Sequence, residues 1–219
     1  MSGLRALLWK ELLAEWRSKE ALATMLFFSA SAMLIFSFAL DLAPIDPHDV
    51  VPAVMWVTFL FASLLGLNRS FAREMEGHSL WGLKLSPIPR SSIYLAKMIG
   101  NFLFLTVIEL IALPLIVVLF NVALPWPTLG VLLLGTLGLS SAGTVFAAMA
   151  VNTRLRDVLL PLMMLPVVVP LMVGVVQVTG ALLKGRMFSD YASSLWLIVA
   201  FDVIFWVTSL LLFDFVLEE

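Results

Sequence analysis

Residues 69–97, RSFAREMEGHSLWGLKLSPIPRSSIYLAK, form the longest polar interruption in an otherwise apolar sequence. This stretch contains five of the thirteen lysines and arginines of the chain. Apolar stretches long enough to cross a membrane precede and follow it, so it must join two spans. Its positive charge predicts that it lies on the cytoplasmic side of the membrane.

A short helix is predicted within this segment. The preceding span is expected to continue as a charged helical end and to stop at Gly77, because glycine leaves helical geometry easily. Residues 80–85 then form one or two helical turns, which Pro87 and Pro89 end because proline donates no backbone hydrogen bond. Apolar side chains such as that of Trp81 need a groove on a partner or a place in the lipid interface. We therefore interpret the short helix as a contact element.

The composition excludes a soluble globular protein. Hydrophobic residues make up 62% of the 219 residues and charged residues only 13%, which is typical of a protein that crosses a membrane several times. The sequence has no cysteine, so it forms no disulfide and no cysteine-ligated metal site. Its basic residues form no stripe that would favour nucleic-acid binding.

Six apolar stretches predict an all-α membrane protein with six transmembrane helices. Each stretch is long enough to cross the hydrocarbon core as a helix. Pro114 allows a kink in the third span, and three prolines predict that the fifth span is bent. Glycine, serine and alanine residues give the fourth span a face that a neighbouring helix can approach closely. The spans are expected at about residues 21–40, 50–67, 98–120, 128–151, 158–183 and 193–217.

Residues 3–19 precede the first span. Leu4, Leu8, Leu12 and Trp16 recur at helical spacing, with Leu7 and Leu13 beside them. This pattern predicts an amphipathic helix at the cytoplasmic membrane interface. Glu15 lies close to this apolar stripe, so a simple basic flank to the first span is the alternative interpretation. A cleavable signal peptide is disfavoured, because the apolar run that follows is longer than the core of a typical signal sequence.

The distribution of positive charge predicts the orientation. Four Lys and Arg residues precede the first span, five lie within residues 69–97 and two lie in the turn 152–157. The remaining two, Lys184 and Arg186, lie on the opposite side. Because positive residues accumulate on the cytoplasmic side, both termini are expected in the cytoplasm.

The sequence predicts no catalytic, cofactor-binding or metal site. A phosphate-binding loop needs glycines followed by Lys and then Ser or Thr, and this motif does not occur. The two histidines, His48 and His78, fall in loops on opposite sides of the membrane, so neither completes a protease or a metal site. A loop histidine such as His48 is more often a solvated residue than a haem ligand.

Two acidic residues fall inside predicted spans, Glu109 in the third and Asp202 in the sixth. A charge at the bilayer centre costs about 2.5 to 3.5 kcal/mol on insertion scales, so each residue should face the interior of the bundle. Both are therefore candidates for a functional role. The alternative is a protonated acid that hydrogen-bonds to a neighbouring helix, for instance to Asn101, Thr106 or Gln177.

The pattern Arg73-Glu74-x-x-Gly77-x-x-Leu80-x-x-Leu83-x-x-Ser86-Pro87-x-x-Arg90, followed by Ala96-Lys97, resembles the cytoplasmic signature of type 2 ABC exporter permeases. Three further stretches narrow this resemblance: LLGLNRSF at 64–71, RLRDVLLP at 154–161 with two later prolines, and the C-terminal FDVIFWVTSLLLFDFVLEE. Together they are similar to the haem exporter protein B (CcmB) family, the membrane subunit of the cytochrome c maturation ABC transporter. The resemblance covers essentially the whole chain.

The resemblance implies a single transmembrane permease domain over residues 1–219 that is not itself an enzyme. ATP would be hydrolysed by a separate cytoplasmic ABC ATPase, and haem is implied as a substrate rather than a bound cofactor. Hydrolysis would drive haem export or the release of a haem-loaded chaperone at the periplasmic face. The implied location is the bacterial inner membrane. The implied partners are the ATPase, a haem-handling membrane subunit, a small single-span subunit, a periplasmic haem chaperone and membrane lipid, with no nucleic acid.

In such a transporter the short helix within residues 69–97 would be a coupling helix that docks in a groove of the ATPase. The alternative for its charged residues is pairing with one another at the helix end. The expected interface consists of Arg73, Glu74, Glu76, Gly77, Leu80, Trp81, Leu83, Pro87, Pro89 and Arg90. Two other functions stay open, a type 2 ABC permease for a lipid or drug and a proton-coupled carrier that uses Glu109 and Asp202. A carrier should show matching broken helices in its two halves.

Overall fold

The computed structural model of the chain describes residues 2–17, 19–42, 45–76, 89–150, 153 and 155–216. These residues form helices and contain no strand. The helices are α1 (Ser2–Arg17), α2 (Lys19–Asp41), α3 (Pro47–Glu76), α5 (Arg90–Phe120), α6 (Pro127–Ala150), α7 (Arg156–Leu183) and α8 (Phe188–Val216). Within this part of the chain, six helices are long and apolar enough to cross a membrane, namely all except α1. The predicted all-α fold with six spans is confirmed.

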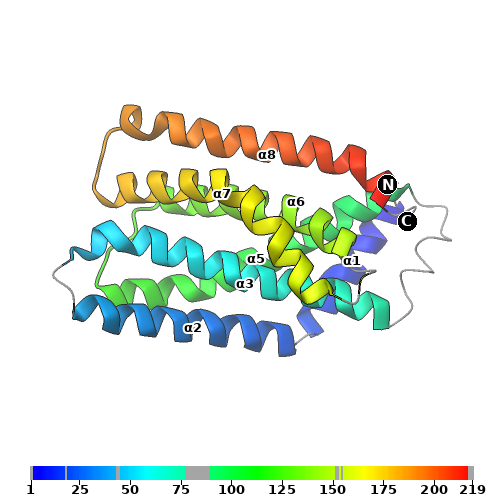
Figure 1. Cartoon of the computed structure of the whole chain (residues 1–219), viewed down its shortest axis with the longest axis horizontal. Helices are drawn as coiled ribbons and strands as arrows, with labels where there is room; N and C mark the ends of the chain where they lie inside the picture. The colour runs from blue at the N-terminus through cyan, green and yellow to red at the C-terminus, as the bar shows by residue number, and fades with distance from the viewer. Residues whose placement is uncertain are drawn as a thin grey trace.

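The six long helices lie alongside one another in a bundle (Figure 1). Both chain termini and α1 lie at one end of this bundle, which we call the terminal end. The connections at 45–46, 121–126 and 184–187 lie at the opposite end, which we call the far end. This arrangement agrees with a chain that crosses a membrane six times and returns to the side on which it began.

Helix α6 occupies the centre of the bundle and packs against α3, α5, α7 and α8. Its glycines make this close packing possible. A Cβ atom at Gly138 would lie 2.6 Å from a methyl carbon of Leu171, and one at Gly135 would lie 3.0 Å from Val175. Glycine is needed at these positions because a larger residue would push the neighbouring helices away. The predicted close approach at small residues of the fourth span is confirmed at Gly135, Gly138 and Gly143, but the prediction was wrong for Gly130, where a Cβ atom would meet no atom within 4 Å.

The helix ends follow from local sequence. Helix α5 ends at Asn121, which has φ 49° and ψ 41°, a left-handed conformation that asparagine adopts at helix C-termini. Its N-cap is Pro89, whose carbonyl oxygen accepts a hydrogen bond from the backbone N–H of Ser92 at 2.9 Å. Ser91 and Ser92, which are residue types that often cap helices, lie inside the first turn. Helices α3 and α5 extend beyond the predicted spans because a helix does not have to stop at the membrane surface.

Helix α7 is continuous and bends partway along its length (Figure 1). It contains Pro161, Pro166 and Pro170, each of which removes one backbone hydrogen bond and crowds the preceding turn. The predicted distortion of the fifth span is therefore present as a bend and not as a break.

Helix α1 confirms that a helix precedes the first span. Among the side chains that the structure describes, its buried face is centred on Leu7, at the side of the predicted stripe. Leu7 and Glu11, which are one turn apart, are buried against the bundle. Leu8 and Leu12 are only partly buried, and Trp9 is 69% exposed. The reason is that α1 packs mainly against α5, and the register of this contact selects the side of α1 that faces inward.

Candidate functional site

The predicted coupling interface falls partly outside the described residues. Arg73, Glu74 and Glu76 belong to the last turns of α3, Pro89 is the N-cap of α5 and Arg90 is its first residue. Gly77, Leu80, Trp81, Leu83 and Pro87 lie outside the residues that the structure describes, so the predicted short helix stays a prediction. The described flanks do fix where this segment leaves and re-enters the bundle, which is at the terminal end (Figure 1).

Each flank of the segment carries a cation that pairs with an acidic residue of the N-terminal helices. On α3, Arg69 Nη1 lies 3.2 Å from Glu20 Oε2 of α2. On α5, Lys97 Nζ lies 3.2 Å from Glu11 Oε2 of α1. The helices before the segment in sequence thus contact both of its ends.

The two ion pairs differ in their burial. The side chains of Arg69 and Glu20 are 44% and 90% exposed, whereas those of Lys97 and Glu11 are 3% and 9% exposed. An exposed pair contributes little to stability, because water and salt screen it. Removing one partner of a buried pair leaves a charge without compensation and is strongly destabilising. Loss of one partner should therefore cost more at the pair between Lys97 and Glu11 than at the pair between Arg69 and Glu20.

The buried pair between Lys97 and Glu11 was not predicted from the sequence. Glu11 lies one turn after Leu7, within a short helix that also carries other charged residues. The pairing between positions 86 residues apart depends on how α1 lies on α5, which helical periodicity does not specify.

Near the middle of the predicted third span, Glu109 of α5 is buried and contacts α6. Thr136 Oγ1 lies 2.5 Å from Glu109 Oε2 and 2.7 Å from the carbonyl oxygen of Leu132. A hydroxyl group has one hydrogen to donate. Both contacts are full hydrogen bonds when the Glu109 carboxyl is protonated and donates to Oγ1, while Thr136 donates to Leu132.

Asp202 of α8 is 5% exposed and contacts α6 at Gly138. A Cβ atom at Gly138 would lie 2.6 Å from Asp202 Oδ1, so the carboxyl occupies the space that the glycine leaves. Neither oxygen of Asp202 has a hydrogen-bond partner among the described residues.

The predicted hydrogen bond from a buried acid to a neighbouring helix is present for Glu109, but its partner is Thr136 and none of the three residues named as examples. Asn101 Nδ2 donates to Thr144 Oγ1 at 3.0 Å, Thr106 Oγ1 donates to its own helix, and Gln177 Oε1 accepts from Ser194 at 2.6 Å. Glu109 and Asp202 also do not meet. Glu109 contacts α6 at position 136 and Asp202 contacts it at position 138. These two positions are separated by about 200° of rotation around the helix axis, so they face nearly opposite sides. The two carboxyl groups therefore lie on different sides of α6 and form no shared site.

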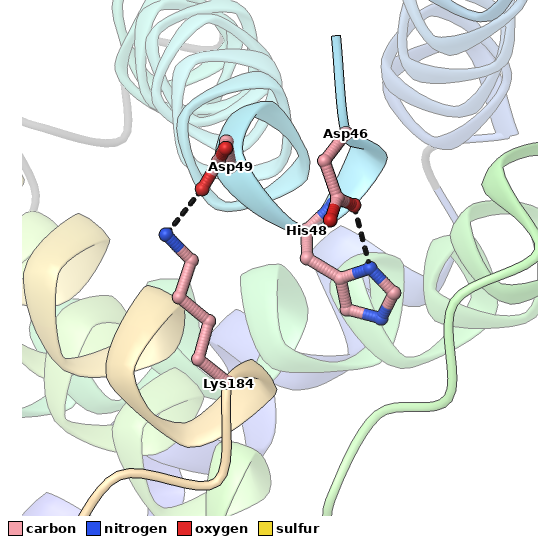
Figure 2. Close-up of polar contacts among 4 residues, drawn as sticks. All are labelled: Asp46, His48, Asp49 and Lys184. Carbon is pink, nitrogen blue, oxygen red and sulfur yellow. Dashed lines mark hydrogen bonds and ion pairs between the residues drawn. The ribbon is translucent and has the colours of Figure 1, made fainter.

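At the far end, the start of α3 carries a cluster of polar residues (Figure 2). Asp46 caps the helix, because its Oδ1 accepts hydrogen bonds at 2.9 Å from both the backbone N–H and the ring Nδ1 of His48. The backbone hydrogen bond, followed by the ring contact, lowers the pKa of Asp46 below its usual value. Lys184 at the end of α7 forms an ion pair with Asp49, which ties α7 to α3 (Figure 2).

This cluster borders two cavities. One, of about 450 Å³, lies between the far ends of α2 and α5, and the other, of about 290 Å³, lies between α3, α7 and α8. His48 lines both. The part of the chain that the structure describes contains no group of three or more His, Asp or Glu residues that could hold a metal ion. His48 lies in the first turn of α3 and not in the predicted loop, and its ring Nδ1 contacts the capping carboxylate of Asp46.

The family described as CcmB protein matches residues 2–217 of the chain. The chain is similar to Heme exporter protein B of Pseudomonas aeruginosa, with 31% identity over 195 residues, which cover 87% of this chain and 86% of that protein. Heme exporter protein B of Escherichia coli is 28% identical over 209 residues, covering 80% of this chain and 88% of that protein. The protein of the same name from Rhodobacter capsulatus is 35% identical over 127 residues, a shorter alignment that covers 57% of this chain and 58% of that protein.

Proposed function

Because this chain belongs to the CcmB family, we propose that it is the permease subunit of an ABC transporter that serves the biogenesis of c-type cytochromes. The observation that carries the proposal is the family match over residues 2–217, which leaves almost no part of the chain outside it. The printed name of its relatives, Heme exporter protein B, supports haem as the compound that the transporter handles. The bundle of six spans supports a role within the membrane.

In the proposed complex, a partner subunit and not this chain hydrolyses ATP. The sequence contains no phosphate-binding loop, so a separate cytoplasmic ABC ATPase would bind and hydrolyse ATP. The permease would pass the resulting movement to the periplasmic face, where haem is exported or a haem-loaded chaperone is released. The complex would also contain a haem-handling membrane subunit and a small single-span subunit.

In this proposal the chain forms one permease domain in the bacterial inner membrane, with its terminal end in the cytoplasm. The charge distribution supports this orientation, because eleven of thirteen Lys and Arg residues fall on that side of the predicted topology. We expect a His48→Cys variant to react with a membrane-impermeant thiol reagent added from the periplasmic side. The native chain has no cysteine, so any labelling reports this position. Labelling only from the cytoplasmic side would reverse the assigned topology.

The function is tested by deleting the gene and measuring covalently bound haem in c-type cytochromes. We expect holocytochrome c to be lost and to return when the intact gene is supplied in trans. Normal holocytochrome c in the deletion strain would refute the proposal. A proton-coupled carrier is not favoured, because Glu109 and Asp202 lie on different sides of α6 and no matching pair of broken spans is present in the described bundle.

A further inference from the structure

A groove of about 600 Å³ lies between α5 and the start of α6, at the far end of the bundle. Its α5 wall extends from Leu110 to Val118. The opposite wall consists of residues 124–126, in the connection between the two helices, together with Thr128 and Leu129 of α6. The groove is therefore formed by one helix hairpin, and both of its walls belong to neighbouring parts of the sequence.

The walls of this groove are apolar. None of the described residues that line it carries a charge, and among them only Trp126 and Thr128 have a polar group in the side chain. Thr128 is 1% exposed, so its hydroxyl is not available to a ligand, whereas Val118 and Trp126 are 76% and 84% exposed. A carboxylate in the groove would lose its water without gaining a partner, which is unfavourable. The part of any ligand that enters the groove must therefore be hydrocarbon.

The depth of the groove in the membrane follows from the length of its α5 wall. Leu110 lies ten residues before Phe120, the last residue of α5, which corresponds to about 15 Å along a helix. This distance is about half of the hydrocarbon core, which is about 30 Å thick. Trp126 lies in the connection beyond the end of α5, and tryptophan is enriched at the membrane–water interface. The groove therefore begins at headgroup depth and ends near the centre of the bilayer.

This depth distinguishes between two apolar occupants. A transmembrane helix of another protein would need a groove that continues across the whole core, whereas an acyl chain reaches from the headgroups only to the centre of the bilayer. We propose that the groove binds one acyl chain of a phospholipid from the leaflet at the far end, with the ester groups of the lipid beside Trp126. Contacts with both walls hold this lipid while other lipids exchange. The inference uses the six spans and is independent of the transporter assignment.

Retention of the lipid is measured at Trp126 of the native chain. The chain is placed in phosphatidylcholine vesicles whose acyl chains carry bromine, which quenches tryptophan fluorescence on contact, and is then extracted into detergent. The difference from a Trp126→Phe variant isolates the signal of Trp126. Trp196, which is 69% exposed on α8, is isolated in the same way with Trp196→Phe and serves as the control. We expect Trp126 to stay quenched in detergent while Trp196 recovers. Recovery of both would overturn the inference.

A substitution that fills the groove provides a second test. Val117 lines the groove and is 40% exposed, so Val117→Phe places a ring where the acyl chain would lie. Val107→Phe is the matched control, because Val107 belongs to the same helix, is 38% exposed and does not line the groove. We expect the phospholipid phosphorus that remains on the washed protein to fall about ten-fold in Val117→Phe, since the ring and the chain would overlap. Val107→Phe should retain the native amount. Equal amounts in the two variants would overturn the inference.

The occupant in the native membrane is identified with a photoreactive side chain. Val118, which is 76% exposed at the groove, is replaced by a benzophenone amino acid, and intact cells are irradiated so that the natural partners of the chain are present. We expect the mass of the purified chain to increase by that of a phospholipid. A cross-link to a protein, whether a second copy of this chain or a membrane helix of a partner, would show that a helix covers the groove and would overturn the inference.

Discussion

At the scale of single residues, buried polar groups in this bundle divide into those that have a partner and those that do not. Glu109 forms a hydrogen bond with the hydroxyl group of Thr136, and Lys97 forms an ion pair with Glu11. Thr58 is also buried, but its Oγ1 atom has no hydrogen-bond partner among the described residues. Because an unsatisfied buried group costs free energy whereas a satisfied one does not, the two threonines should respond in opposite ways to the same substitution.

We predict that Thr136→Val lowers the free energy of unfolding by about 1–3 kcal/mol, because the Glu109 carboxyl then has no partner in a dry environment. The matched control is Thr58→Val, which removes a hydroxyl without a partner and should leave stability unchanged or slightly higher. The measurement is the thermal unfolding midpoint of each purified protein in the same detergent. Equal losses for the two variants would show that the hydrogen bond between Thr136 and Glu109 does not stabilise the bundle.

At the scale of helices, the position of α6 depends on the absence of side chains at its glycines. The Trp56 ring lies against Gly135, and its Nε1–H donates to Thr179 Oγ1 of α7 at 2.9 Å. This hydrogen bond holds the ring in place, so the ring has little freedom to make room for a new methyl group. Helices α3, α6 and α7 are thereby fixed to one another at one point.

Gly135→Ala should therefore destabilise the protein by about 1–3 kcal/mol, the usual cost of adding a methyl group to a packed core. Gly130→Ala is the control, because the new Cβ would meet no atom within 4 Å. Alanine favours a helix over glycine, so the control should be as stable as the native protein or slightly more stable. Urea or thermal unfolding in detergent distinguishes the two. A harmless Gly135→Ala would mean that α3 and α7 do not pack on α6 as closely as described.

The helices could be predicted from the sequence, and their contacts largely could not. An apolar run of the length of residues 128–151 has one stable structure in a membrane, so its helix follows from backbone hydrogen bonding alone. Periodicity does not say which neighbour a side chain meets. The sequence predicted that Glu109 faces the interior of the bundle. It did not predict that Glu109 forms a hydrogen bond with Thr136. The partner of Lys97 was missed for the same reason, because Glu11 approaches it only after α1 has packed on α5.

At the scale of the whole molecule, the two ends of the bundle differ in the elements and contacts that form them. The far end closes with a helix cap at Asp46 and an ion pair between Asp49 and Lys184. The terminal end carries α1, the flanks of the segment between α3 and α5, and both chain termini. An ATPase that changes shape on binding ATP can do work on the bundle only through a contact that differs between its two states. The terminal end is where such a contact is proposed.

The coupling assignment predicts that Leu80→Asp combined with Leu83→Asp detaches the ATPase and leaves the bundle inserted. Both leucines lie in the polar segment outside the six spans, so aspartate there should not hinder membrane insertion. In the groove of a partner, however, two buried carboxylates without counter-charges would prevent docking. We expect the double variant to be present in the membrane at the native level, to lose the ATPase on purification and to abolish holocytochrome c.

Leu155→Asp is a suitable control for this double variant, since Leu155 is 67% exposed and lies in a separate connection, before α7. It should retain the ATPase, because it adds a carboxylate outside the segment between α3 and α5. Membrane abundance is measured by immunoblot and ATPase binding by co-purification. If the ATPase remains bound to the double variant and haem delivery is normal, the short helix is only a membrane-surface loop. The ATPase must then dock on another part of the chain, for which α1 would be the next candidate because its Trp9 side chain is 69% exposed.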